Sequence, residues 1–157
     1  EIRWTDRCPL PVLALRLLSG FWAACVPFVG LYGWAIPFFG YLLDGAAGAM
    51  VGLVTLLLLA YVAWGSYRLN VRAWWCAVSL ALIWGVSAGI TFSRVPLMEF
   101  YARMNIPEQQ LEMMRQFSLP GPPGMVLFSV LWMAIVVGYL LYTKRYFGSR
   151  SEPPRAP

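Results

Sequence analysis

The amino-acid sequence predicts an all-α fold: a polytopic membrane protein with four transmembrane helices and an amphipathic interfacial helical segment between helices three and four. Only 12% of the 157 residues are charged, which is about half the fraction typical of soluble domains. Cutting the chain at charged residues leaves four uncharged runs, at 17–43, 45–67, 73–93 and 116–143. Each run exceeds the roughly 20 residues that a helix needs to cross the hydrocarbon core. The runs are also continuous, whereas strands of a membrane β-barrel alternate apolar and polar residues.

The first predicted helix covers about residues 11–36 and contains Pro27. We expect a kink there, because proline lacks the N–H of a regular helix. The uncharged run at 17–43 is too long for one simple crossing, so the chain should leave the helix before the run ends. We expect an interfacial turn through Phe38, Phe39 and Tyr41, since aromatic residues are enriched at the membrane interface.

The other three helices are predicted at about 46–67, 73–93 and 123–143. The segment Pro120-Gly121-Pro122-Pro123 should break any helix before the fourth one, because proline and glycine interrupt helices. The four helices then form a single transmembrane domain over residues 1–147. Residues 148–157 are predicted to be a flexible cytoplasmic tail.

The distribution of charge predicts the orientation. With four crossings, the N-terminal segment, the link between helices two and three, and the tail share one side, which holds nine basic and three acidic residues. The opposite side holds three basic and four acidic residues. The positive-inside rule then places both termini in the cytoplasm. The basic residues flank apolar runs and form no stripe, so we expect no nucleic-acid partner.

Small residues recur at four-residue spacing in two of the predicted helices. Gly48 and Gly52 form a GxxxG pattern in helix two, and helix three carries Ala81, Gly85 and Gly89. Such patterns let helix backbones approach closely in lipid. Two interpretations stay open: helices two and three pack on each other through these residues, or the residues form a dimerisation face.

The segment 95–118 is too polar to span the membrane and predicts two short amphipathic helices. Asn105 would cap the second of them, with Glu108 at its third position. The apolar face that we expect comprises Phe100, Tyr101, Met104, Leu111, Met114 and Phe117. This face would be a lid over the bundle, a docking surface for a partner, or simply a connector resting on lipid.

The residues predict neither catalysis nor a bound cofactor. The chain has no histidine, which is the commonest general base and a frequent metal ligand. Cys8, Cys25 and Cys76 occur singly, with no CxxC spacing. The charged residues fall at the ends of the four runs or outside them, whereas a proton relay would need ionisable groups in the middle of the membrane. We therefore predict no catalytic residue, no cofactor and no metal.

The hairpin at 61–82 carries the one resemblance that we find. Its turn reads Tyr67-Arg68-Leu69-Asn70-Val71-Arg72-Ala73-Trp74-Trp75. This pattern, an aromatic and basic turn followed by tryptophans, resembles small four-helix bacterial integral membrane proteins of unknown function. The resemblance implies a location in the bacterial inner membrane.

Three functions are compatible with these observations. The leading hypothesis is a non-catalytic accessory or structural subunit of a larger membrane complex, with membrane lipid and other subunits, or a second copy, as partners. The first alternative is a small channel or carrier for an apolar or lipid-like molecule. The second alternative is a membrane-embedded enzyme that modifies lipid and uses Asp44 or the glutamates of 95–118.

Overall fold

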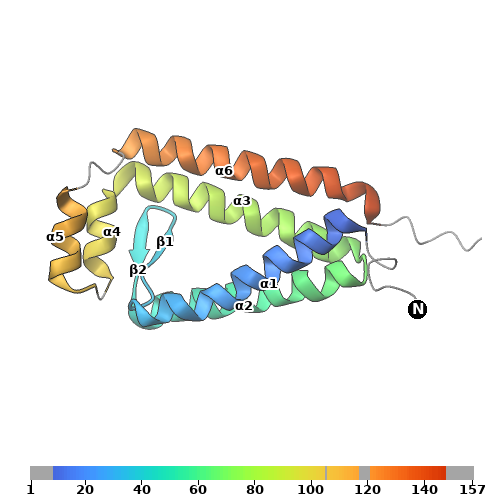
Figure 1. The fold of residues 1–157 in the computed structure, drawn as a ribbon, viewed down its shortest axis with the longest axis horizontal. Coiled ribbons are helices and arrows are strands. Elements are labelled where there is room, and N and C mark those ends of the chain that lie inside the picture. Colours follow the sequence, from blue (N-terminus) through green and yellow to red (C-terminus); the bar gives the residue numbers. More distant parts are fainter. Residues whose placement is uncertain (1–8, 105, 117–120, 148–157) are drawn as a thin grey trace, which may run out of the picture.

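The structure, a computed structural model, describes residues 9–104, 106–116 and 121–147. It confirms the all-α polytopic fold (Figure 1). Within these described residues, four helices are long and apolar enough to cross a membrane. They are α1 (Leu10–Leu31), α2 (Gly45–Tyr67), α3 (Val71–Arg94) and α6 (Pro122–Thr143).

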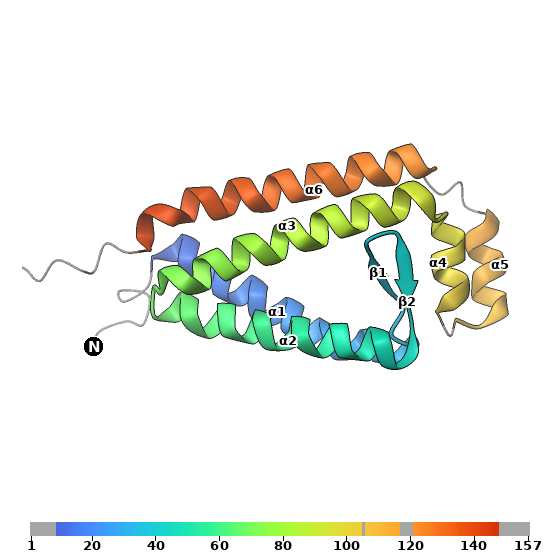
Figure 2. The same cartoon turned by 180° about the vertical axis from the view of Figure 1, so that it is seen from behind.

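The four long helices form two pairs, α1 with α2 and α3 with α6. The pairs converge at the end of the bundle where α1 begins and α6 ends, which we call the termini end (Figures 1 and 2). They separate toward the opposite end, where α2 begins and α3 ends, which we call the hairpin end. This divergence leaves room between the pairs.

A packed core holds the two pairs together at the termini end. Val12, Val62, Trp74 and Leu140 come from all four long helices and are almost completely buried. The indole N–H of Trp74 donates a 2.8 Å hydrogen bond to the carbonyl oxygen of Leu140, which ties α3 to α6. A buried tryptophan needs such a partner, because an unpaired polar group in an apolar core is costly.

The first helix is shorter than predicted, and a β-hairpin follows it. We expected a helix to about residue 36, but α1 ends at Leu31 and contains Pro27. The amide N–H of Trp34 bonds back to the carbonyl of Val29, and φ is +81° at Gly33 and +58° at Trp34. Left-handed backbone of this kind ends a helix.

In place of the predicted interfacial turn, β1 (Ile36–Phe38) pairs antiparallel with β2 (Tyr41–Leu43). Phe39 and Gly40 form the two-residue loop, and both have positive φ, as the tight turns of hairpins require. Glycine adopts this conformation at little cost, whereas Phe39 needs support from the surrounding structure. The hairpin crosses from the end of the first helix pair toward α3 (Figure 1).

The remaining elements lie close to their predicted bounds. Helices α2, α3 and α6 begin one or two residues earlier than expected. The side chain of Asn70 accepts a 2.9 Å hydrogen bond from the N–H of Arg72, and this N-cap places the start of α3 at Val71. After α6, a short 3-10 turn, η2 (Lys144–Tyr146), ends the described chain together with Phe147.

The two short helices expected within 95–118 are present, as α4 (Leu97–Arg103) and α5 (Glu108–Gln116). They lie side by side across the hairpin end of the bundle (Figure 1). The predicted cap, Asn105, lies outside the described residues. Pro107 comes directly before α5, and its carbonyl oxygen accepts a 2.9 Å hydrogen bond from the N–H of Gln110.

Candidate functional site

A cavity of about 460 Å³ lies between the two helix pairs. It exists because the pairs diverge toward the hairpin end, so that their side chains no longer meet. All four long helices, the start of the hairpin and α4 contribute to its wall. The residues that line it are Leu15, Leu18, Ser19, Trp22, Cys25, Val26, Val29, Ala35, Ile36, Pro37, Gly52, Thr55, Leu59, Val62, Ala77, Leu80, Ala81, Trp84, Phe100, Met104, Trp132, Val136 and Leu140.

The wall of this cavity is almost entirely hydrocarbon and indole. Among the described residues that line it, the only hydroxyl groups belong to Ser19 and Thr55. Both donate 2.8 Å hydrogen bonds to carbonyl oxygens of their own helices, Leu15 and Val51 respectively. No charged side chain is among the lining residues. A molecule held here would therefore be recognised through shape and dispersion contacts.

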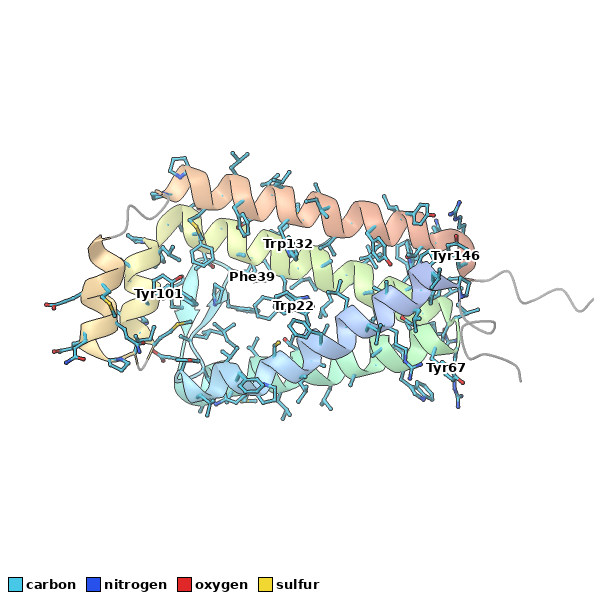
Figure 3. The ribbon with its side chains drawn as sticks, viewed as in Figure 1. Trp22, Phe39, Tyr67, Tyr101, Trp132 and Tyr146 are labelled. Atoms are coloured by element: carbon cyan, nitrogen blue, oxygen red, sulfur yellow. The ribbon has the colours of Figure 1, made fainter. Side chains whose placement is uncertain are left out.

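Part of the cavity wall on α1 and α6 is exposed at the surface. Trp22 on α1 and Trp132 on α6 both line it, yet they are 46% and 48% exposed. Figure 3 shows the two indoles in the space between these helices. Nearer the termini end, the hydroxyl of Tyr139 on α6 donates to the carbonyl oxygen of Pro11 on α1 and joins the helices. We infer from these two half-exposed rings that the cavity opens laterally, toward the lipid that would surround the bundle.

Two buried hydroxyl groups on α3 fix the tip of the β-hairpin. The N–H of Phe39 donates to Ser87 Oγ at 2.9 Å, and Ser87 Oγ donates to the carbonyl of Pro37 at 3.1 Å. The N–H of Gly40 donates to Thr91 Oγ1 at 2.9 Å. These bonds satisfy backbone groups that cannot find water inside a membrane protein. The hairpin is therefore held across the gap between the two helix pairs.

The predicted GxxxG pattern accommodates a tryptophan instead of a second helix. A Cβ added to Gly48 would collide with the carbonyl oxygen of Trp34, and one added to Gly52 would stand 2.5 Å from the Trp34 ring. On the facing helix, a Cβ at Gly30 would stand 2.8 Å from the same ring. Gly30 of α1 and Gly52 of α2 thus make room for the indole of Trp34, and Gly48 makes room for its backbone carbonyl.

The predicted small-residue pattern on α3 does not form one continuous contact face among the described residues. Gly85 packs against Met133 of α6, where an added Cβ would stand 2.7 Å from the thioether. Ala81 lines the cavity. Gly89 has no neighbour within 4 Å of where a Cβ would stand. The close α2–α3 approach occurs elsewhere, between Gly65 and Ala73.

The residues of the predicted lid or docking face lie in different parts of the structure. Phe100 of α4 and Met104, which directly follows α4, both line the cavity. The ring of Tyr101 lies 5.8 Å from that of Phe100, measured between centroids. Leu111 and Met114 lie in α5, and Phe117 lies outside the described residues. Helix α4 therefore covers the hairpin end of the cavity.

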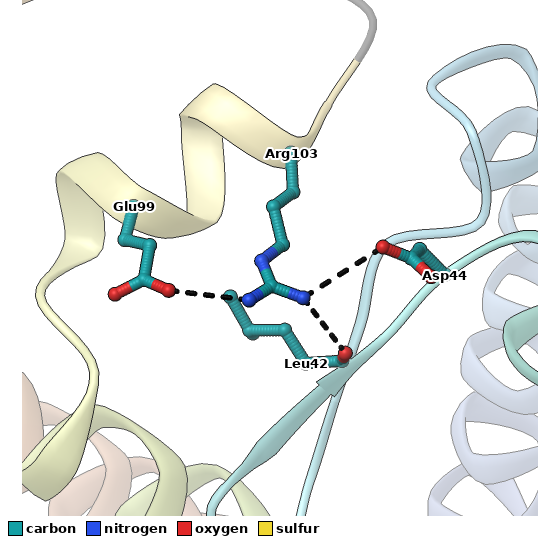
Figure 4. A network of polar contacts seen from close by, with 4 residues as sticks. All are labelled: Leu42, Asp44, Glu99 and Arg103. Carbon is teal, nitrogen blue, oxygen red and sulfur yellow. Dashed lines mark hydrogen bonds and ion pairs between the residues drawn. The ribbon is translucent and has the colours of Figure 1, made fainter.

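Arg103 joins α4 to the hairpin and to the start of α2 (Figure 4). Its Nη1 lies 3.7 Å from Asp44 Oδ2 and donates a long, 3.5 Å hydrogen bond to the carbonyl oxygen of Leu42. Its Nη2 lies 3.3 Å from Glu99 Oε1, one turn earlier in α4. The side chains of Arg103 and Asp44 are 44% and 60% exposed. Exposed pairs of this kind contribute about 0–1 kcal/mol, so the attachment is weak.

The carboxylates of the described residues do not line the cavity. Asp44 and Glu99 both approach Arg103, and neither is among the lining residues. The described part of the chain contains no group of three or more histidine, cysteine, aspartate or glutamate side chains that could hold a metal ion.

Four apolar helices around this cavity define an integral membrane protein. In comparisons with protein families, curated proteins and solved structures, nothing matches the chain. The resemblance of its 61–82 hairpin to small bacterial membrane proteins stays a prediction.

Proposed function

We propose that this protein binds the hydrocarbon chain of a lipid-like molecule in the cavity between its helix pairs and acts as a carrier for it. The apolar wall of the 460 Å³ cavity carries the proposal. Ligand cavities in proteins measure roughly 300–1,000 Å³ and are mostly apolar. The lateral opening beside Trp22 and Trp132 gives a chain in the bilayer a route inward.

The same wall argues against a path for ions or water. An ordered water needs about 2–4 polar partners, whereas the hydroxyls of Ser19 and Thr55 already donate to their own helices. An ion would meet no charged side chain among the lining residues. Of the channel and carrier alternatives, the lining favours a carrier for an apolar molecule.

The accessory-subunit hypothesis stays a prediction, and the small residues now support it less. Gly48, Gly52 and Gly85 are contacted from within the chain, so a partner helix could use them only by displacing Trp34 or Met133. The enzyme hypothesis needed two carboxyls converging on one cavity. Asp44 and Glu99 converge on Arg103, outside the lining.

We also propose the bacterial inner membrane as the location, with both termini in the cytoplasm. The charge asymmetry of the sequence supports this orientation, and α1 begins at the same end of the bundle at which α6 ends. Labelling single cysteines at either end of the bundle in intact cells tests it. A termini end that reacts with an impermeant reagent from outside would overturn the orientation.

The proposed function is tested by measuring what the purified protein retains. The full chain is extracted in mild detergent, delipidated by gel filtration, and its bound lipids are counted by native mass spectrometry. We expect about one tightly held lipid-like molecule per chain. Ala81→Phe fills the cavity and should remove that molecule. Ala60→Phe adds the same ring to an exposed position of α2 and serves as the matched control.

Three outcomes would contradict the carrier proposal. The first is a wild-type protein that retains no lipid. The second is equal loss in the Ala81→Phe and Ala60→Phe variants, which would show a general effect of the added ring. The third is stoichiometric co-purification of other membrane proteins with an empty cavity, which would restore the subunit hypothesis as the leading one.

A further inference from the structure

The termini end of the bundle gathers basic side chains. Within the described residues, this end carries five of them, Arg16, Arg68, Arg72, Lys144 and Arg145. The carboxylates of the described chain lie in or next to elements at the hairpin end: Asp44 precedes α2, Glu99 is in α4, and Glu108 and Glu112 are in α5. The basic residues therefore have no carboxylate partner at their own end of the described structure.

On the α1–α2 side, two of these cations lie over aromatic rings. The guanidinium of Arg16 is 4.7 Å from the centroid of the Tyr67 ring. The guanidinium of Arg68 is 4.3 Å from that of the Trp64 ring. Both rings are about half exposed, so the stacked cations lie at the outer surface of the bundle.

The α3–α6 side repeats the arrangement. The ammonium of Lys144 is 5.5 Å from the Trp74 ring and 5.9 Å from the Trp75 ring. The guanidinium of Arg145 is 4.2 Å from the centroid of the Tyr142 ring. Cations are thus fixed over aromatic rings on both sides of the termini end, where tryptophan and tyrosine mark the headgroup level of a bilayer.

An aromatic face orients a cation without using its hydrogen-bond donors. A guanidinium carries five N–H donors in one plane, and stacking on a ring leaves these donors at its edge. Arg145 directs one donor, on Nη2, at the Tyr146 hydroxyl at 2.8 Å, and its other donors remain at the edge. Arg103 at the hairpin end differs, because its donors are directed at Asp44, Glu99 and Leu42. The stacked cations are positioned to bind phosphate oxygens, which guanidinium groups hold well.

We propose that the termini end is a binding surface for the headgroups of anionic phospholipids. Arg16 and Arg68 bind them on one side of the bundle, and Lys144 and Arg145 bind them on the other. The aromatic rings hold the cations at the depth of the lipid phosphates. This surface does not include the cavity. An experiment can therefore contradict the headgroup proposal without contradicting the carrier proposal, and the reverse also holds.

The test compares lipid selection by matched variants in nanodiscs. The full chain is placed in equal amounts of phosphatidylglycerol and phosphatidylcholine, and retained lipids are counted after ejection from the nanodisc by native mass spectrometry. Wild type should be enriched in phosphatidylglycerol. Arg16→Gln and Lys144→Gln should each lower that enrichment by about fivefold, the factor expected for one cation at an anionic surface. Arg16→Lys and Lys144→Arg should keep it.

Arg103→Gln is the control, because it removes one positive charge at the opposite end. The proposal is overturned by equal retention of the two lipids in the wild type, or by a loss in Arg103→Gln as large as in Arg16→Gln. Competition by millimolar inorganic phosphate would also overturn it, because the surface would then bind the free anion. Circular dichroism identifies a variant that fails to fold. For such a position, lipid selection by the charge-conserving variant, Arg16→Lys or Lys144→Arg, then tests the proposal.

Discussion

The carbonyl oxygen of Trp34 occupies the space that a β-carbon on Gly48 would need. In the sequence, Trp34 precedes the hairpin and Gly48 follows it. Because Gly48 has no side chain, the backbone after α1 can pack directly on α2. In a membrane, where helices gain little from burying apolar surface against one another, such close contact is a main source of stability.

Gly48→Ala should therefore destabilise the protein. Since the added methyl group meets backbone, the hairpin segment must shift, and overpacking of this kind costs about 1–3 kcal/mol. Thermal unfolding in detergent, followed by near-ultraviolet circular dichroism, measures the loss. Gly20→Ala is the control, because nothing lies within 4 Å of the added carbon there. Equal transition temperatures for the Gly48→Ala variant and the wild type would contradict this prediction, because they would show that the hairpin segment shifts without loss of stability.

The hydroxyls of Ser87 and Thr91 give a second prediction. Replacing both by alanine leaves the amides of Phe39 and Gly40 without acceptors, at about 1–3 kcal/mol for each buried group. The hairpin tip should then detach from α3. Hydrogen exchange at these two amides should accelerate in the double variant, while exchange within α2 stays slow.

Ser93→Ala supplies the comparison for this experiment. The Ser93 hydroxyl is exposed and donates to the carbonyl of Ile90 in its own helix, whereas the amides of Phe39 and Gly40 donate to Ser87 and Thr91. Its removal should leave exchange at the tip unchanged. Protection of Phe39 and Gly40 that survives in the Ser87→Ala/Thr91→Ala variant would mean that packing, and not these hydrogen bonds, holds the hairpin.

The sequence predicted the number of long helices and most of their bounds because both depend on local composition. An uncharged run of about 20 residues in this context has few alternatives to a helix. The two short helices of the 95–118 segment could also be predicted, since Pro107 and the apolar spacing around it are local signals. These features need no knowledge of what packs against them.

The sequence contains local signals for the hairpin but none for the cavity. Gly33 and Gly40 lie inside the long run at 17–43, and both adopt positive φ in the structure. Ser87 and Thr91, which bind the hairpin, lie four residues apart on α3. The sequence around them does not indicate that Ser87 binds Phe39. The cavity results from divergence between two helix pairs, which is a tertiary property with no local pattern.

Two neighbouring tryptophans provide a matched pair for the core at the termini end. Trp74 is 1% exposed and donates to the carbonyl of Leu140, whereas Trp75 is 54% exposed. Trp74→Phe should destabilise the protein by about 1–3 kcal/mol, because it removes a buried hydrogen bond and leaves a space. Trp75→Phe should change stability by less than about 0.5 kcal/mol, as expected for a surface position. Thermal unfolding of the two variants under identical conditions makes the comparison, and equal losses would contradict the assignment of Trp74 to the core.

The attachment of α4 through Arg103 predicts a lid that responds to salt. Arg103→Gln removes both ion pairs, so α4 should leave the cavity more often. A cysteine at Met104, which lines the cavity, reports the opening through its reaction with a water-soluble maleimide, in a chain whose natural cysteines are replaced by alanine. The reaction should accelerate up to about fivefold, the factor that corresponds to a pair worth 0–1 kcal/mol.

Raising the salt concentration to about 1 M should accelerate labelling of the Met104→Cys chain with Arg103 intact, because the Debye length then falls to about 3 Å. The same salt should have little further effect once Arg103 is replaced by glutamine. Arg94→Gln is the control, since Arg94 makes no ion pair within the described residues. If labelling were equally fast in the Arg94→Gln and Arg103→Gln chains, or insensitive to salt in the parent, α4 would be held by Phe100 and its ring contact with Phe92 instead. Helix α4 would then be a fixed cover, and lipid exchange would depend on the lateral opening beside Trp22 and Trp132 alone.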